Sequence, residues 1–308
     1  MDITILIPVY NEEKNVALLH TKLTEVLEKL TKKYEIIFID DGSNDKTVPE
    51  IKILTEKDDK TKLIQFRGNF GKSNALNVGF KEAQGKVVFT MDGDLQDGPN
   101  EIPKFLEAIK KYDIVSGWKF KRHDPITKTI PSKLANYVTR KATGVKIHDM
   151  NCGFKAYRNE VTKNLELYGD MHRYVPALAT AKGYRVGEIK VLHHPRKFGK
   201  SKYGFMRLFR GLFDFMTIRF LTNYSNRPLH FFGGWGILLG MIGFLAELYA
   251  VYLKIFKNQY FADHIGIIIL GFMLITLGFQ LVSTGLLGEM MIKRKEKDGY
   301  EVRRKIGF

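Results

Sequence analysis

Two long apolar stretches near the C-terminus constrain the fold of this chain more than any other feature. They cover residues 231–252 and 265–287, and each is close to the ~20 residues that a helix needs to cross a bilayer. The second has no charged residue, and the first carries only Glu247, near its far end. The pair predicts a hairpin of two transmembrane helices; two core helices of a soluble domain are the alternative.

Basic residues flank this predicted hairpin. Residues 196–227 and 293–305 are rich in Lys and Arg, whereas the connection 253–264 has only Lys254 and Lys257. Basic flanks stay on the cytosolic side of a membrane. We therefore expect both ends of the chain in the cytosol.

Glycines recur along the first apolar stretch, at Gly233, Gly234, Gly236, Gly240 and Gly243. Small residues allow transmembrane helices to approach closely. We expect several hairpins to associate into a homo-oligomer.

The segment before the hairpin is amphipathic. Residues 203–224 mix Phe, Leu and Met with arginines and one acid, Asp214, which is typical of helices in a membrane interface; a buried amphipathic helix is the alternative. We divide the chain into a cytosolic domain (1–200), amphipathic juxtamembrane helices (201–228), two transmembrane helices (229–288) and a basic cytosolic tail (289–308).

Short apolar runs alternate with amphipathic stretches from residue 3 to about residue 118. This is the pattern of βα units that build a mostly parallel sheet. We predict strands at 3–9, 35–40, 63–66, 86–91 and 114–117. We predict helices at 12–30, 73–83 and 102–111. After residue 118 we expect a basic loop over 119–131, a helix over 132–143, and a turn leading into a strand over 149–158.

Polar clusters follow three of the predicted strands, at residues 10–12, 40–43 and 92–94. Ligands of parallel sheets gather beyond the carboxyl ends of the strands. The three clusters therefore predict one site.

The cluster at residues 92–94 is suited to a cation. Asp92 and Asp94 are separated by a glycine that permits a tight turn, and Gln96 follows. Such oxygen ligands can hold Mg²⁺ or Mn²⁺, which would stabilise a nucleotide diphosphate as a leaving group. A solvated acidic turn is the alternative.

Two further segments contribute polar groups. Asp41 can accept hydrogen bonds from a base or a ribose; an Asx turn with a cap for the helix after Asp45 is the alternative. Residues 67–72 combine Arg67 and Lys72 with glycines, a usual way to bring backbone N–H groups and cations towards phosphate.

The net charge of +16 requires anionic partners. Nucleic acid, anionic lipid and nucleotide phosphates would all serve, but aromatics interleaved with Lys and Arg, as in nucleic-acid binders, are not found. The single cysteine, Cys152, excludes an internal disulfide.

Four motifs occur in order along the N-terminal half: IPVYNEE at 7–13, DDGS at 40–43, NFGK at 69–72 and DGDLQD at 92–97. Their combination resembles family 2 glycosyltransferases of the GT-A fold. Within that family it is most similar to the polyprenyl-phosphate glycosyltransferases, which include dolichol-phosphate mannose synthases and bacterial prenyl-phosphate glucosyltransferases. Residues 153–155, 171–174, 196–203 and the apolar pair also resemble these enzymes.

The resemblance implies roles for individual residues. The residues expected to bind the nucleotide sugar are Pro8, Tyr10, Glu12, Asp41, Lys72 and Asp92. Those expected around the metal are Asp92, Asp94 and Gln96. Those expected to face phosphates are Arg122, Arg140, Arg196, Lys200, Ser201, Lys202 and Tyr203. The residues expected to act in catalysis are Asp94, Asp149 and Arg122. Lys119 stands where many relatives have Arg, and Lys cannot reproduce a bidentate clamp.

The resemblance also implies an activity: inverting transfer of one hexose to undecaprenyl phosphate on the cytosolic face of the membrane. We favour UDP-glucose as donor, then UDP-N-acetylglucosamine; GDP-mannose with dolichol phosphate is an alternative. The Gln-x-x-Arg-Trp motif of processive relatives is absent, which favours single transfer. The resemblance further implies a tetramer. A non-catalytic membrane partner protein is the alternative of another class.

The acceptor needs little activation. A phosphate monoester has a second pKa of about 6 and is already an anion at neutral pH. A strong protein base is then dispensable. Asp149 is expected to orient the attacking oxygen or the sugar, or else to stabilise its own turn.

Overall fold

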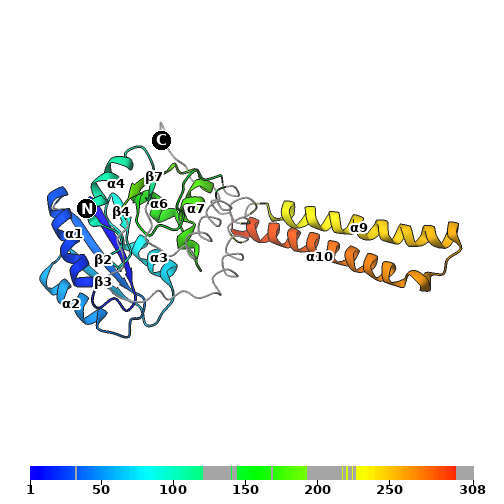
Figure 1. Ribbon diagram of the computed structural model, residues 1–308, viewed down its shortest axis with the longest axis horizontal. Helices are drawn as coiled ribbons and strands as arrows, with labels where there is room; N and C mark the ends of the chain where they lie inside the picture. The colour runs from blue at the N-terminus through cyan, green and yellow to red at the C-terminus, as the bar shows by residue number, and fades with distance from the viewer. Residues whose placement is uncertain are drawn as a thin grey trace. The chain divides into compact units, whose positions relative to one another are not determined.

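The computed structural model describes residues 1–31, 33–120, 140, 144–167, 169–192, 217, 220, 224 and 227–295. The chain forms two compact units, Met1–Thr222 and Asn223–Phe308. Figure 1 shows the sheet and its helices in the first unit and a helical hairpin in the second.

Within the described residues, the first unit is built on a seven-stranded sheet of order β3-β2-β1-β4-β6-β5-β7. The strands are β1 (Ile3–Val9), β2 (Tyr34–Asp40), β3 (Thr61–Gln65), β4 (Val87–Thr90), β5 (Ile114–Lys119), β6 (Lys155–Arg158) and β7 (Val186–Val191). The first five overlap the strands predicted from sequence, and β6 follows the predicted turn. The expected mostly parallel sheet is confirmed, whereas β7 was not predicted.

One strand runs against the others. β6 is antiparallel to both neighbours, β4 and β5, while every other pairing is parallel. Lys155, the first residue of β6, pairs with Thr90 of β4 and Ser116 of β5. The chain therefore enters β6 at the edge where β4 and β5 end.

Helices cover both faces of this sheet. They are α1 (Val16–Leu30), α2 (Thr47–Lys57), α3 (Lys72–Glu82), α4 (Ile102–Ala108), α6 (Asn159–Asn164) and α7 (Val175–Ala181). Alternation along β1 places Ile5 in one core with α1, α2 and α4, and Leu6 in the other with α3, α6 and α7. Helices α6 and α7 were not predicted, and α1 starts later than predicted because the carbonyl of Glu12 accepts the N–H groups of Asn15 and Val16 in a turn.

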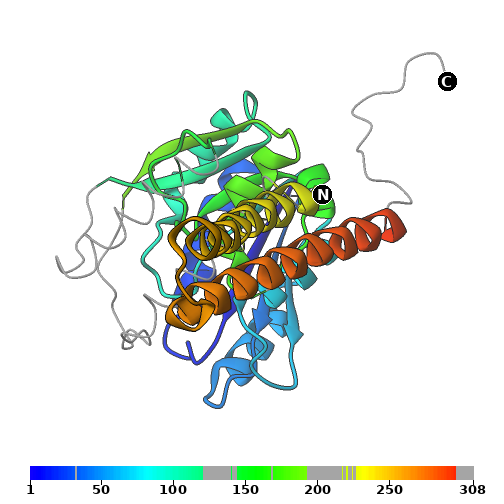
Figure 2. The same ribbon diagram turned by 90° about the vertical axis from the view of Figure 1, so that its right-hand side faces the viewer.

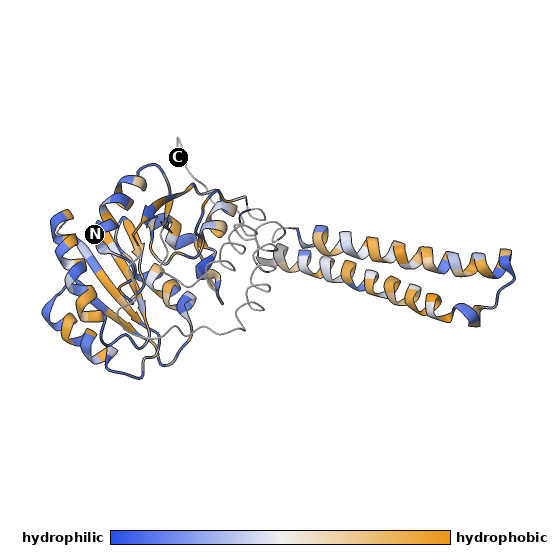
Figure 3. Ribbon diagram, viewed as in Figure 1, coloured by the Kyte–Doolittle hydropathy of each residue, from blue (hydrophilic) through white to orange (hydrophobic). Residues whose placement is uncertain are grey.

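The second unit is a hairpin of α9 (Pro228–Lys257) and α10 (Ile265–Lys295), joined through the 3₁₀ turn η3 (Phe261–His264). Figure 2 shows the two helices side by side, and Figure 3 shows their apolar character. Both are long and apolar enough to cross a membrane. They contain the two predicted stretches and indicate membrane association.

Glycines bring the two helices together at regular intervals. A Cβ added at Gly236 would lie 2.6 Å from the carbonyl oxygen of Gly278, and one at Gly243 would lie 2.5 Å from that of Gly271. The backbones therefore touch at these positions, as small residues allow in membranes. Gly236 and Gly243, which the sequence suggested for association between copies, are used within the hairpin.

Glu247 also lies at this contact. A Cβ at Gly271 would meet its Oε1 at 2.5 Å, and within the described residues Oε1 is buried without a hydrogen-bond partner. The carboxyl group is therefore covered by the second helix, as expected for an acid in an apolar helix.

Replacing Gly243 by Ala is expected to loosen the hairpin, because the new methyl group would overlap the carbonyl oxygen of Gly271. We expect a thermal midpoint several degrees lower for the full-length protein in detergent, with earlier loss of helical circular dichroism. The matched control is Gly240→Ala, whose Cβ has nothing within 4 Å. Equal midpoints for the two variants would contradict this packing.

Candidate active site

Most of the residues predicted to bind the nucleotide and the metal lie at or just beyond the ends of β1, β2 and β4, at one edge of the sheet. Pro8, Tyr10 and Glu12 are half-buried, and Asp41 and Asp94 are buried. Because β1, β2 and β4 are parallel, their carboxyl ends meet at this edge. The topology of the sheet therefore brings the three polar clusters together at this edge.

Asp41 joins the segment after β2 to the loop before α3. Its Oδ1 accepts the N–H of Phe70 at 2.7 Å, and its Oδ2 accepts the N–H of Gly71 at 3.0 Å. Burial raises the pKa of Asp41, although these two bonds oppose the shift. The loop's N–H groups, which the sequence suggested for phosphate, are thus bonded to a carboxylate.

A glycine makes this approach of the loops feasible. Gly42 has φ +76°, and a Cβ there would lie 2.4 Å from the backbone of Gly68. Beside it, Asp40 accepts the N–H of Ser43 at 3.2 Å. The Asx turn considered as an alternative is therefore formed by Asp40, while Asp41 holds the neighbouring loop.

The segments after β1 and β2 hold each other. The N–H of Asn11 donates to Ser43 Oγ at 2.9 Å, and the N–H of Asn44 donates to Asn11 Oδ1 at 2.8 Å. The N–H of Glu12 donates to Thr47 Oγ1 at 2.8 Å. Tyr10 and Glu12 thus lie on a segment fixed against the one that carries Asp41.

The carboxylate of Asp92 lies between the side chain of Lys72 and the backbone of Gly153. Lys72, the first residue of α3, makes an ion pair with Asp92 Oδ1. A Cβ at Gly153 would lie 2.4 Å from Asp92 Oδ2. Burial would raise the pKa of Asp92, but Lys72 and Lys119 together hold it well below its ordinary value. Asp92 is therefore an anion.

The loop after Asp92 turns sharply. Leu95 has φ +63°, and the N–H of Gln96 donates to Asp94 Oδ1 at 3.2 Å. Asp94 is 7% exposed. Asp92, Asp94 and Gln96 thus lie on one short loop with a sharp turn at Leu95.

Asp97 and Lys119 form a buried ion pair, with 3.2 Å between Lys119 Nζ and Asp97 Oδ1. Burial would lower the pKa of Lys119, but Asp97 and the other nearby anions raise it above its ordinary value. Burial and the neighbouring carboxylates raise the pKa of Asp97. Lys119, expected from resemblance to stand where an Arg faces phosphate, is instead paired with an internal carboxylate.

Two basic side chains near the site were not predicted from the sequence. Lys155 is 2% exposed, and its ammonium group donates to the carbonyl of Cys152; burial lowers its pKa to about 8. His172 lies against Ser73, with 3.0 Å between His172 Nδ1 and Ser73 Oγ, and burial lowers its pKa to about 2. The sequence motifs that contain Lys155 and His172 were recognised, but the sequence did not indicate that these two side chains are buried.

Asp149 lies in the turn before β6 and is 1% exposed. Its Oδ1 accepts the N–H of Asn151 at 3.2 Å. The neighbouring His148 stacks on Trp118 with 4.1 Å between ring centroids, and its N–H donates to Glu188 at 2.7 Å. The turn is therefore held firmly, and Asp149 takes part in its internal bonding.

Several predicted phosphate ligands lie outside the described residues: Arg122, Arg196, Lys200, Ser201, Lys202 and Tyr203. Arg140 is half-buried, and its carbonyl accepts the N–H of Gly144 at 2.9 Å. The predicted helix over 132–143 and the interfacial segment 203–224 lie almost entirely outside them as well.

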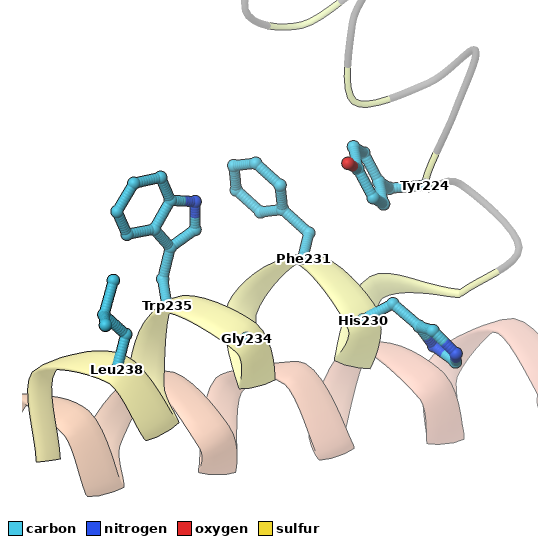
Figure 4. A pocket seen from close by; sticks show the side chains of 6 residues that line it. All are labelled: Tyr224, His230, Phe231, Gly234, Trp235 and Leu238. Carbon is cyan, nitrogen blue, oxygen red and sulfur yellow. The ribbon is translucent and has the colours of Figure 1, made fainter. Parts of the chain in front are cut away.

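The second unit carries an apolar groove at the start of α9. Figure 4 shows its lining: Tyr224, His230, Phe231, Gly234, Trp235 and Leu238. Gly234 has open space where a Cβ would stand. Aromatic and aliphatic walls of this kind suit an apolar chain.

Comparison with known proteins agrees with this arrangement. Residues 4–166 match the model of the glycosyl transferase family 2 domain. The dodecaprenyl-phosphate galacturonate synthase of Rhizobium johnstonii is 33% identical over 97% of this chain and 90% of its own. The undecaprenyl-phosphate 4-deoxy-4-formamido-L-arabinose transferase of Pectobacterium atrosepticum is 33% identical over 94% of this chain and 87% of its own.

A solved structure has the same fold. It is the glucosyl-3-phosphoglycerate synthase of Mycobacterium tuberculosis in complex with Mn²⁺, UDP-glucose and glycerol 3-phosphate. The two superimpose with a TM-score of 0.53 at 15% identity, over 72% of this chain and 79% of the other. The likeness confirms the GT-A type of sheet.

Proposed function

The chain belongs to glycosyltransferase family 2, and we propose that it transfers a single sugar from a nucleotide sugar to the phosphate of a polyprenyl lipid. The observation that carries this proposal is that one chain combines a GT-A sheet, with polar residues gathered at one edge, and a hairpin long and apolar enough to cross a membrane. The family favours an enzyme over a non-catalytic membrane partner.

The nucleoside is proposed to lie against the segments after β1 and β2. Asp41 is fixed by two backbone N–H groups, and a carboxylate still has lone pairs for a ribose or base donor. Pro8, Tyr10 and Glu12 lie on the neighbouring segment. The mutual hydrogen bonds of the two segments keep this surface in place before the ligand arrives.

Asp92, Asp94 and Gln96 are proposed to hold Mg²⁺ or Mn²⁺. Within the described residues, no group of three or more His, Cys, Asp and Glu side chains could hold a metal by itself. Mg²⁺ is usually bound through one or two carboxylates, with substrate phosphates as further ligands. Two acidic side chains and an amide on one loop match that chemistry. The metal would neutralise the diphosphate that leaves.

The acceptor phosphate is proposed to attack as an anion, so the protein must bring two anions together and screen their repulsion. Lys72 can serve the donor diphosphate. Arg122, Arg140 and residues 196–203 remain predicted phosphate ligands, and Asp149 remains the predicted orienting residue. The apolar groove at Trp235 suits part of the polyprenyl chain.

The donor sugar is proposed to be glucose carried by UDP, with N-acetylglucosamine next and GDP-mannose to dolichol phosphate as the alternative. The names of the two relatives add galacturonate and 4-deoxy-4-formamido-L-arabinose to the sugars to be compared. Their prenyl-phosphate acceptors support the lipid side of the proposal. We also propose that both termini lie in the cytosol and that the protein forms a homo-oligomer.

Incubation of the purified full-length protein with polyprenyl phosphate, Mn²⁺ and each radiolabelled nucleotide sugar tests this function. We expect one donor to give a lipid-soluble product carrying a single sugar, and EDTA to abolish its formation. The matched control omits the lipid. Absence of lipid-linked product with every donor would contradict the proposal, and a product with several sugars would contradict single transfer.

A further inference from the structure

The ion pair between Lys72 and Asp92 places one cation where another is proposed to bind. Asp92 Oδ1 contacts the ammonium group of Lys72. The same carboxylate is a proposed ligand of the divalent metal. Lys72 and the metal therefore compete for the negative charge of this one carboxylate.

This pair is half-buried, whereas the Lys119–Asp97 pair described above is almost fully buried. The side chains of Lys72 and Asp92 are 31% and 32% exposed, whereas those of Lys119 and Asp97 are 14% and 0% exposed. Solvent screens a partly exposed pair, so that it contributes less to stability than its contact suggests, while breaking a fully buried pair is costly. Lys72 can therefore leave its partner, and Lys119 cannot do so easily.

The position of Lys72 in the fold also suits a second partner, the diphosphate of the proposed nucleotide. It is the first residue of α3 and follows the loop that Asp41 fixes, next to the proposed nucleoside surface. The N-terminal end of a helix favours anions. A diphosphate bound there would attract the Lys72 side chain away from Asp92.

We propose that Lys72 and the divalent cation exchange at Asp92: Lys72 neutralises Asp92 while no nucleotide is bound, and it moves to the diphosphate when the nucleotide arrives, leaving Asp92 to the metal. This inference rests on the proposed function. It makes Lys72 a positioning residue that couples metal binding to nucleotide binding. Such coupling is reciprocal, so each ligand strengthens the binding of the other.

The exchange predicts an effect of Lys72 on Mn²⁺ affinity that is present without nucleotide and lost when nucleotide is bound. Without nucleotide, Lys72 competes with the metal, so Lys72→Met should bind Mn²⁺ about threefold to tenfold more tightly than wild type, as expected for loss of a partly exposed ion pair. With saturating UDP or GDP, Lys72 is on the diphosphate and no longer competes. The variant should then bind Mn²⁺ no more tightly than wild type, and its nucleotide affinity should be lower.

The experiment measures free Mn²⁺ by electron paramagnetic resonance with full-length protein, without nucleotide and with saturating UDP or GDP. Lys72→Arg keeps the competing charge and should resemble wild type without nucleotide. Lys110→Met removes the same charge from an exposed pair with Glu107 and should leave Mn²⁺ affinity unchanged. These two variants separate the local exchange from a change in net charge.

Three outcomes would overturn the exchange. Unchanged or weaker Mn²⁺ binding by Lys72→Met without nucleotide would show that Lys72 does not compete. If Lys72→Met bound Mn²⁺ more tightly by the same factor with and without nucleotide, Lys72 would act only through its charge and would not move between partners. Wild-type protein that binds neither nucleotide would overturn the proposed function and the exchange together, whereas the first two results leave the proposed function intact.

Discussion

Asp94→Asn is expected to lower kcat by about 10²- to 10³-fold, because a neutral amide would replace a charged ligand of the metal that stabilises the leaving diphosphate. Asp94 is 7% exposed, and its Oδ1 accepts the N–H of Gln96. An amide oxygen can accept the same bond, so the fold should be retained. Steady-state kinetics with increasing Mn²⁺ would measure the loss, and high Mn²⁺ should restore part of the activity.

The control for this variant is Asp2→Asn, which removes the same charge from an exposed ion pair with Lys86. It should keep wild-type kinetics. Full activity of Asp94→Asn, or of the wild type in EDTA, would show that the metal assignment is wrong.

Gly153→Ala is expected to reduce kcat/KM by about 10²-fold, because an error of about 1 Å in a catalytic group can cost that much. The new methyl carbon would stand 2.4 Å from Asp92 Oδ2. The backbone has little room to yield, since the carbonyl of Gly153 accepts the hydroxyl of Thr90 at 2.9 Å. Asp92 must therefore turn away from its observed position.

Binding and kinetics together separate this effect from unfolding. Gly153→Ala should keep the thermal midpoint within a few degrees of wild type while Mn²⁺ affinity in the presence of UDP falls. Gly240→Ala adds the same methyl group where nothing lies within 4 Å and should behave as wild type. Normal Mn²⁺ binding and turnover in Gly153→Ala would contradict the placement of Asp92 in the site.

Much of this architecture follows from local pattern. Buried strands such as β1 and β2 are mostly apolar runs, and the hairpin helices are too apolar and too long for most other environments. Parallel strands end at one edge, so the positions of the polar clusters after β1, β2 and β4 were predictable as soon as the strands were. The sequence determined the class of fold, the hairpin and the edge of the sheet that carries the candidate site.

The tertiary structure decided how the charges at that edge are paired. Gly153 and Lys155 reach the site only because β6 runs antiparallel and begins where β4 ends. The residues of β6 do not by themselves indicate the direction of the strand. The pairing of Lys119 with Asp97 and of Lys72 with Asp92 depends on contacts between segments far apart in the chain. Local periodicity reports which face of an element is buried; it does not report which distant charge the fold brings against it, because that is fixed by strand order and register.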